Sequence, residues 1–401
     1  IGRSDHPPGK GIMAVCRRST AAPHLYGGGM KLTFPRIGDS HIYGRLLFRE
    51  LGVDIIIPAP NSEEGLLRGA AKSPEDICLP FKMMTDNLLS AWEKGADTVV
   101  MPATMGPCRL GEYGELLAVV MQKYGCNYRW ILLDSLSAIG PKELLRRLSM
   151  VVEDSPRSTA GILLALAKTY SLIKSHEKLQ ADARMQSPYE KEKGTVKFIL
   201  SVCRKELEKA DSLSDAMEAV RRNRHRLLTL ERSTKRRPLK LLITGEIYTQ
   251  IDSFGNHHIE DTLMDLGVSF EKGMSIGWWI RNTVLNPFGG LLAEIKKNPL
   301  MPHRIGGYAK ETVNDAIRYA KEDFDGIIQL FPVGCMPEIV AKSVLDDLTK
   351  EERLPALSII YDEMGGEAGY ATRIEAFVEM LERKRETKDV LSGNRCGVCK
   401  H

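Results

Sequence analysis

The chain has 401 residues, 43% apolar and 27% charged, and 56 basic against 52 acidic side chains give a net charge of +4. This balance is typical of a globular protein of two or three domains, and it excludes disordered and collagen-like classes. Eight cysteines are too few for a disulfide scaffold, and no apolar run reaches the roughly 18 residues that span a bilayer. We therefore expect a cytoplasmic protein that binds neither membrane nor nucleic acid.

The two ends of the chain carry little structural signal. Residues 1–29 are rich in Gly, Pro, Arg and His without periodicity, and we interpret them as a disordered N-terminal extension with Met30 as the natural start. Cys16 lies in this segment and is expected to carry no chemistry. Residues 386–401 are predicted to be a flexible tail. Their CxxC motif, Cys396 and Cys399, supplies only two ligands for zinc or redox exchange.

Residues 30–140 are predicted to form a first α/β lobe. Short apolar strands are expected at 31–34, 52–58, 97–102 and 130–134, with helices at 43–51 and 81–94. Continuous apolar strands that alternate with amphipathic helices indicate a parallel sheet covered by helices on both faces.

Residues 141–237 are predicted to form a helical subdomain, because apolar positions recur every three or four residues between prolines. Its most basic stretch runs from Arg221 to Arg226. No aromatic residues interleave with these charges, so a solvated helix face is favoured over a nucleic-acid or protein docking surface.

Residues 238–385 are predicted to form a second α/β lobe that repeats the order of the first. Its strands are expected at 240–244, 325–332 and 357–362, with helical residues up to 266 and at 311–321. The sequence thus predicts an α/β fold with two parallel-sheet lobes from an internal duplication and a helical subdomain between them.

Three cysteines lie beside the expected strands and helices. Cys108 follows the strand that ends at Pro102, and Cys335 follows the equivalent strand that ends at Pro332. Loops after the carboxyl ends of parallel strands are where open α/β sheets place their sites. Cys78 precedes the helix at 81–94, where the helix dipole is expected to favour its thiolate.

These three cysteines, on separate Pro- and Gly-containing loops, are predicted to be a ligand set. Soft thiolates select zinc, copper(I) or iron–sulfur clusters. Structural zinc usually takes four ligands in closely spaced pairs, unlike these, but a zinc site completed by a histidine remains an alternative. A cubane cluster held by three cysteines leaves one iron open. Cys126 and Cys203 are interpreted as packing cysteines.

Four segments resemble the 2-hydroxyacyl-CoA dehydratase subunit family, and closest are its acyl-CoA dehydratase activase-related members. Three are its cysteine loops, Ile77-Cys78-Leu-Pro-Phe81-Lys82, Met105-Gly-Pro-Cys108-Arg109-Leu-Gly-Glu-Tyr113 and Pro332-Val-Gly-Cys335-Met-Pro-Glu338. The fourth, residues 361–377, is similar to the family's C-terminal signature. The resemblance covers roughly Met30 to Lys384.

The resemblance implies two flavodoxin/Rossmann-like lobes and a [4Fe–4S] cluster held by Cys78, Cys108 and Cys335. It also implies a homo- or hetero-dimer and a partner, an ATP-hydrolysing iron–sulfur activator protein that delivers an electron at low potential. In the dehydratases, this electron allows water to be removed from a 2-hydroxyacyl-CoA. Related proteins hold a double-cubane cluster with more cysteines than the three matched here. The chain has no G-x-x-x-x-G-K-[ST] loop, so we do not expect it to bind ATP itself.

Nothing in the sequence identifies a CoA pocket. The catalytic candidates are Arg109, Glu338 and Glu367, and further polar groups near the expected site are Glu112, Asp362, Glu363 and Arg373. Arg109 is positioned to neutralise cluster charge, and Arg373 is expected to orient loops through an ion pair with a carboxylate. His257 and His258 are candidates for a fourth ligand or a proton donor, although solvent exposure is favoured for both. The alternative function is a non-catalytic electron relay or scaffold that carries the cluster for a partner enzyme.

Overall fold

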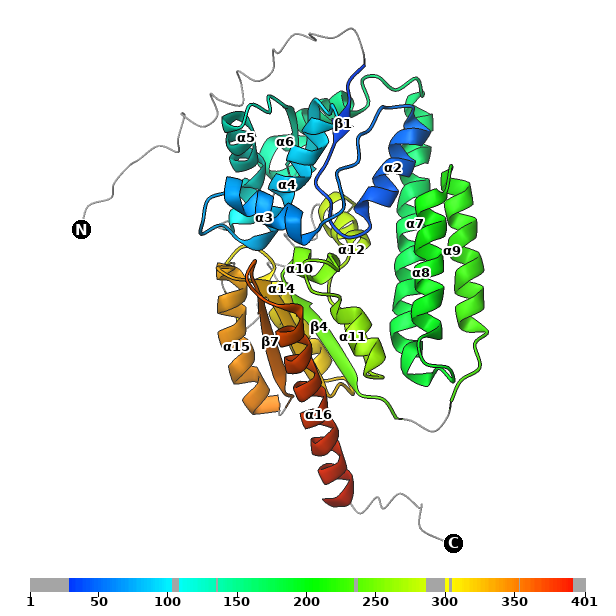
Figure 1. Ribbon diagram of the computed structural model, residues 1–401, viewed down its shortest axis with the longest axis vertical. Helices are drawn as coiled ribbons and strands as arrows, with labels where there is room; N and C mark the ends of the chain where they lie inside the picture. The colour runs from blue at the N-terminus through cyan, green and yellow to red at the C-terminus, as the bar shows by residue number, and fades with distance from the viewer. Residues whose placement is uncertain are drawn as a thin grey trace, which may run out of the picture.

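The computed structural model describes residues 29–102, 108–134, 136–233, 237–285, 300–302, 305–352 and 354–391. Two parallel sheets with packed helices are joined by a long helical segment (Figure 1), so the predicted α/β class is confirmed. In these segments, no helix combines the length and the apolar character needed to cross a membrane. Cys16, Cys396 and Cys399 lie outside the described residues.

The first sheet has three parallel strands in the order β1 (Leu32–Thr33), β2 (Thr98–Pro102) and β3 (Arg129–Leu133). The strand predicted at 52–58 is wrong, because the structure has only a single parallel bridge there, between Ile55 and Leu32. Pro58 and Pro60 lack the amide hydrogens that a longer ladder requires. The helices of this lobe are α2 (Ser40–Leu51), α3 (Glu63–Lys72), α4 (Leu79–Glu93), η1 (Arg109–Glu112) and α5 (Tyr113–Lys123).

The segment after the first sheet is helical as far as residue 228. It contains α6 (Leu136–Val151), α7 (Thr159–Gln186), η2 (Ser187–Tyr189), α8 (Thr195–Lys209) and α9 (Leu213–Leu228). Ser158 and Ser212 begin α7 and α9, since each side-chain oxygen accepts a backbone amide of the first turn. Helices α7, α8 and α9 lie side by side around a common apolar core, and α2 packs against α7 (Figure 1).

The second sheet has four parallel strands in the order β5 (Ser269–Lys272), β4 (Lys240–Gly245), β6 (Gly326–Pro332) and β7 (Ala356–Tyr361). All seven residues of β6 are buried, which explains why all of them but Gln329 are apolar or glycine. The helices are α10 (Ile247–Ile251), α11 (Ile259–Asp265), α12 (Ile276–Ile280), η3 (Arg281–Leu285), α14 (Ala309–Ala320), α15 (Met336–Glu352) and α16 (Glu367–Leu391). Helix α16 extends into the segment predicted to be a flexible tail.

The two lobes pack on each other through one apolar core. This core runs from Phe81 and Leu117 of the first lobe to Leu330 and Tyr361 of the second. Polar contacts also cross the junction, such as the hydrogen bonds that Asn61 donates to the Tyr248 hydroxyl (3.1 Å) and the Asp252 carboxylate (3.0 Å). The carboxyl ends of β4 and β6 lead to this junction, where the cysteine loops meet.

Candidate metal centre at the junction of the lobes

The structure brings Cys78, Cys108 and Cys335 together, because all three line one cavity of about 20 Å³. That volume is about the room of one water molecule. Cys78 and Cys108 come from the first lobe and Cys335 from the second, so the cavity forms only when the lobes are packed together. Residues 103–107, which lead into Cys108, lie outside the described residues.

Each of the three cysteines stands immediately before a helical segment. The Cys78 carbonyl accepts the amide of Phe81 in α4, and the Cys108 carbonyl accepts the amide of Gly111 in η1 (both 3.1 Å). The Cys335 carbonyl accepts the amide of Ile339 in α15 (3.0 Å). The backbone of each cysteine is therefore fixed by the first turn of a helical segment.

Burial controls the ionisation of the three thiols. It raises the pKa of Cys78 to about 11 and also raises the pKa values of Cys108 and Cys335. The Tyr113 hydroxyl contacts the Cys78 sulfur and lowers its pKa, but less than burial raises it. Burial of the Cys78 thiol therefore opposes the thiolate that we expected the start of α4 to favour.

Two buried carboxyl groups line the same cavity. Glu338, predicted as a candidate, accepts hydrogen bonds from the Thr312 hydroxyl (3.1 Å) and the Gln329 amide (2.9 Å). Burial raises the pKa of Glu338 to about 8. The second one, Glu246, was not among the predicted candidates. It follows the carboxyl end of β4, at the same sheet edge as Cys335, and that position was the available signal.

The cavity is lined by acidic groups. Among the described residues that line it are three thiols and two carboxyl groups, and none is Lys, Arg or His. Buried groups of this kind ionise only when a positive charge compensates them. The arrangement is thus chemically suited to a metal cofactor.

The described residues do not form a site for a single metal ion. Within the described ranges, no three Cys, His, Asp or Glu side chains are grouped closely enough to hold one ion. The alternative zinc site also lacks its histidine, because neither His257 nor His258 lines the cavity. The His257 ring stacks on Tyr370 with a centroid distance of 4.7 Å, and His258 lies 3.8 Å from Asp261.

Arg109 holds the two cysteine loops of the first lobe together. Its side chain is exposed and Nη1 donates to the carbonyl of Asp76, two residues before Cys78, at 2.6 Å. It does not line the cavity. Glu112 ends η1 and directly precedes α5. The contact supports a positioning role for Arg109 beside the predicted role in charge neutralisation.

The other candidate polar groups surround the segment after β7 and do not line the cavity. Glu363 pairs with Lys82 of α4, and the Asp362 carboxylate accepts the amide of Met364 (3.0 Å). Glu367 is exposed in the first turn of α16. Arg373 donates to the carbonyl of Ser358 (3.0 Å) rather than to the carboxylate that we expected.

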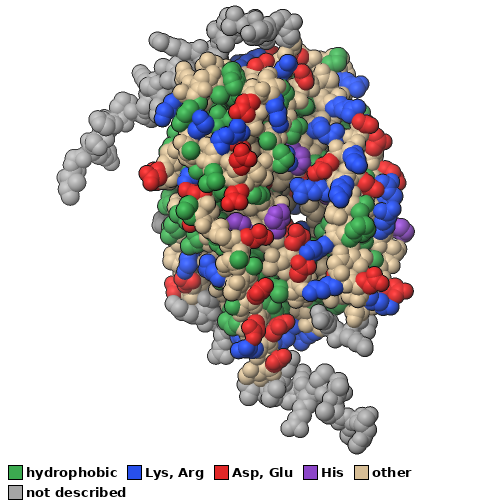
Figure 2. Space-filling model, viewed as in Figure 1, with side chains coloured by type: hydrophobic (Ala, Val, Ile, Leu, Met, Phe, Trp, Pro, Cys, Tyr) green, Lys and Arg blue, Asp and Glu red, His purple; other side chains and the backbone are tan. Residues whose placement is uncertain are grey.

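The remaining described cysteines and the basic run have structural surroundings. Cys126 is 5% exposed and Cys203 is fully buried, and both belong to apolar cores. In the basic run, Arg222 pairs with Glu206 (3.0 Å) and Arg224 pairs with Asp182 (2.8 Å). Figure 2 shows basic and acidic side chains interspersed over these helices, as expected of a solvated surface.

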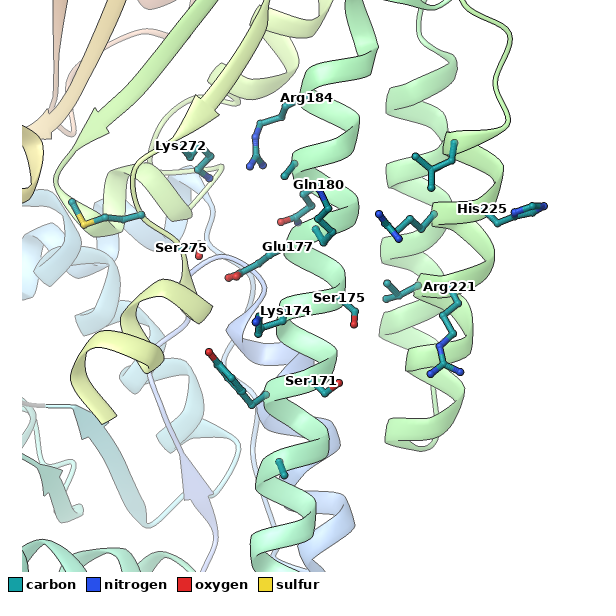
Figure 3. A pocket seen from close by; sticks show the side chains of 18 residues that line it. Ser171, Lys174, Ser175, Glu177, Gln180, Arg184, Arg221, His225, Lys272 and Ser275 are labelled. Carbon is teal, nitrogen blue, oxygen red and sulfur yellow. The ribbon is translucent and has the colours of Figure 1, made fainter. Parts of the chain in front are cut away.

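A cavity of about 1000 Å³ lies elsewhere, between α7, α9 and the segment after β5 (Figure 3). Its lining is basic, but Arg184 and Lys272 both pair with Glu260, at 3.4 Å and 2.6 Å. In Figure 3, Glu177 points from α7 towards the segment after β5, whereas Arg221 of α9 points away from it. The cysteines do not line this cavity, so we place the candidate site at the smaller one.

Residues 41–271 match the family described as CoA enzyme activase uncharacterised domain (DUF2229). The match covers more than half of the chain and runs from α2 into β5. It includes Cys78, Cys108 and Glu246, whereas Cys335 lies beyond it. The comparison with curated proteins found no match.

Proposed function

The chain belongs to the family of the CoA enzyme activase uncharacterised domain, and from this premise we propose that it is an iron–sulfur protein. Cys78, Cys108 and Cys335 would hold a [4Fe–4S] cluster. An ATP-hydrolysing activator protein would supply electrons for low-potential reductive or radical chemistry, such as the dehydration of a 2-hydroxyacyl-CoA. As part of the same proposal, we assign the chain to the 2-hydroxyacyl-CoA dehydratase subunit family.

The observation that supports this proposal is the meeting of three cysteine loops from two lobes around one cavity. The donor set fits an iron–sulfur cluster, because thiolates are its usual ligands and a cluster distributes them over several irons. The irons of a bound cluster would also supply positive charge to balance the surrounding thiolates and carboxylates. A [4Fe–4S] core is larger than a cavity of about 20 Å³, so the proposal requires the cysteine loops to move apart during assembly.

A bound cluster of this kind supplies one-electron chemistry at low potential. The chain's own residues would position it and handle protons. Arg109 fixes the loop of Cys78 against the loop of Cys108. Glu338, whose pKa is raised to about 8 by burial, holds a proton at neutral pH and is our candidate for exchanging it with a substrate.

The surface beside Cys335 supports an enzyme or activator partner. Val333, Met336 and Ile339 flank Cys335 and are 51%, 44% and 51% exposed. Adjacent exposed apolar side chains are typical of a protein contact surface. The name of the family likewise mentions a CoA enzyme, which favours a partner enzyme and an acyl-CoA substrate.

We also propose that the lobes are flavodoxin-like and arose by duplication. The order β5–β4–β6–β7 places the second strand in sequence beside the first and then the third and fourth, as in flavodoxin-like sheets. In the first lobe, Ile55 bridges to Leu32 of β1. This pairing corresponds to that of β5 with β4 in the second lobe.

Anaerobic purification or reconstitution with iron and sulfide tests the proposal. We expect about four irons and four sulfides per chain, and the loss of this content in Cys335→Ser. Cys126→Ala is the matched control, because it removes a buried thiol from an apolar core and should leave the iron content unchanged. Stoichiometric zinc without iron in the wild type would contradict the proposal.

The alternative is an electron relay or scaffold that holds the cluster for a partner. It requires only that the opened cavity hold the cluster, with no additional room for a substrate beside it. Electron paramagnetic resonance of the reduced protein, with and without acyl-CoA thioesters, separates the two functions. A changed spectrum favours the enzyme, and spectra that no thioester perturbs favour the relay.

A further inference from the structure

Glu246 is held rigidly at the edge of the second sheet. Its amide donates to the carbonyl of Leu330 in β6 (2.8 Å). Gly245 before it has φ of 124°, and a Cβ at this position would lie 2.0 Å from the same carbonyl oxygen. Only glycine permits this close approach of the chain to β6, so the local backbone fixes where the Glu246 side chain begins.

The Glu246 carboxylate is oriented by hydrogen bonds and yet keeps acceptor capacity. Oε1 accepts the amide of Tyr248 (2.9 Å). Oε2 accepts both the amide (2.9 Å) and the hydroxyl (3.3 Å) of Thr249. A carboxylate has about four acceptor positions, two on each oxygen, so one position on Oε1 remains for another partner. The residue is 7% exposed and lines the cysteine cavity.

Glu246 and Glu338 are the two carboxyl groups that line the cavity together with Cys78, Cys108 and Cys335. Both oxygens of Glu338 already accept the Thr312 hydroxyl, and Oε2 also accepts the Gln329 amide. Each carboxylate therefore keeps one acceptor position on Oε1. Glu246 differs in being held by two backbone amides, those of Tyr248 and Thr249, at the edge of the second sheet.

Three cysteines account for three irons of a cubane cluster, and one iron remains without a protein sulfur. We propose that Glu246 binds this iron through Oε1 as the fourth protein ligand. The inference rests on the proposed function, since it requires the cluster. An anchored carboxylate would keep the fourth iron in place and leave it less open to solvent than a water ligand would.

Mössbauer spectroscopy of protein reconstituted with ⁵⁷Fe tests the ligand directly, without an activity assay. An iron bound to oxygen has a different signal from irons bound only to sulfur, so we expect two environments in a ratio of about 3:1 in the wild type. In Glu246→Cys, four thiolates surround the core and the spectrum should collapse to one environment. In Glu246→Gln, mild oxidation should release the fourth iron and produce the resonance of a [3Fe–4S] cluster.

Glu338→Gln is the matched control, because it alters the other buried carboxyl of the same cavity and should keep the 3:1 spectrum. Circular dichroism establishes that each variant is folded. A wild-type protein without a cluster would overturn the proposed function, and the inference with it. A cluster whose spectrum and oxidation behaviour are unchanged in Glu246→Cys and Glu246→Gln would overturn the inference alone.

Discussion

The ammonium of Lys82 and the carboxylate of Glu363 lie 2.5 Å apart and join the two lobes one helical turn from Cys78. The Lys82 side chain is 4% exposed and the Glu363 side chain is 28% exposed. Because the two partners differ in hydration, removing one should not have the same consequence as removing the other.

We expect Glu363→Gln to destabilise the protein more than Lys82→Met. Without Glu363, an ammonium stays buried and unpaired, which costs about 3–5 kcal/mol. Without Lys82, the carboxylate is still partly hydrated and the loss is smaller. Urea unfolding of the two variants and the wild type measures the difference, and equal losses would contradict the assigned burial.

Asp315 of α14 should make stability depend on pH. Burial raises the pKa of its carboxyl from 3.8 to about 7, and the backbone of Gly273 lies against Oδ2. The folded state therefore holds a proton that the unfolded state releases, so the contribution to stability is complete below about pH 4 and is lost as the pH rises through about 7.

The variant Asp315→Asn should remove this fall and be more stable than the wild type at pH 8, by roughly 1–3 kcal/mol. Thermal unfolding at pH 5 and pH 8 is the measurement. Asp323→Asn is the control, because the Asp323 side chain is 82% exposed and the variant should leave the profile unchanged. A wild-type profile without the fall would show that the Asp315 carboxyl is not buried.

Alanine substitutions at Gly245 and Gly95 distinguish the cost of backbone strain from the cost of a steric clash. Both have positive φ, 124° and 89°, but a Cβ at Gly95 has no atom within 4 Å. We expect Gly95→Ala to cost about 1–2 kcal/mol and Gly245→Ala about 3–5 kcal/mol, because the latter also forces β4 away from Leu330. Chemical denaturation gives both values. Equal costs would mean that β4 and β6 approach less closely than described.

The contact of the Tyr113 hydroxyl with the Cys78 sulfur should tune a bound cluster. A hydrogen bond to a ligand sulfur stabilises the more electron-rich, reduced state and raises the reduction potential. We therefore expect Tyr113→Phe to lower the potential while iron content stays unchanged. A redox titration followed by electron paramagnetic resonance measures it. Tyr128→Phe is the control, since the Tyr128 hydroxyl donates to the Leu88 carbonyl and not to a cysteine.

Strands and helices were largely predictable because their signals are local. The largely apolar sequence of β6 follows from complete burial of the strand, and α4 begins within two residues of its expected start. The prediction of a strand at 52–58 was wrong. Its neighbour β1 offers only two residues for pairing, and the sequence of 52–58 alone does not reveal this.

The candidate site was predictable only in part. Cys108 and Cys335 were recognisable because each follows a strand in a Pro- and Gly-containing loop. Glu246 was not, because a single acid after a strand is common at solvated turns and nothing local distinguishes it. Its proposed role depends on the close approach of β4 to Leu330, which is a contact between distant parts of the chain.

The sequence by itself determined the α/β class, the position of three cysteines before or after regular elements, and the assignment of Cys126 and Cys203 to packing. These features depend on periodicity and short-range hydrogen bonds, which act over a few residues. Only the tertiary structure decided that the cysteines share a cavity with Glu246 and Glu338, and that burial raises the pKa of Cys78 despite its place before a helix. Desolvation arises from all surrounding segments at once, so it follows from the packing of both lobes and not from any one motif.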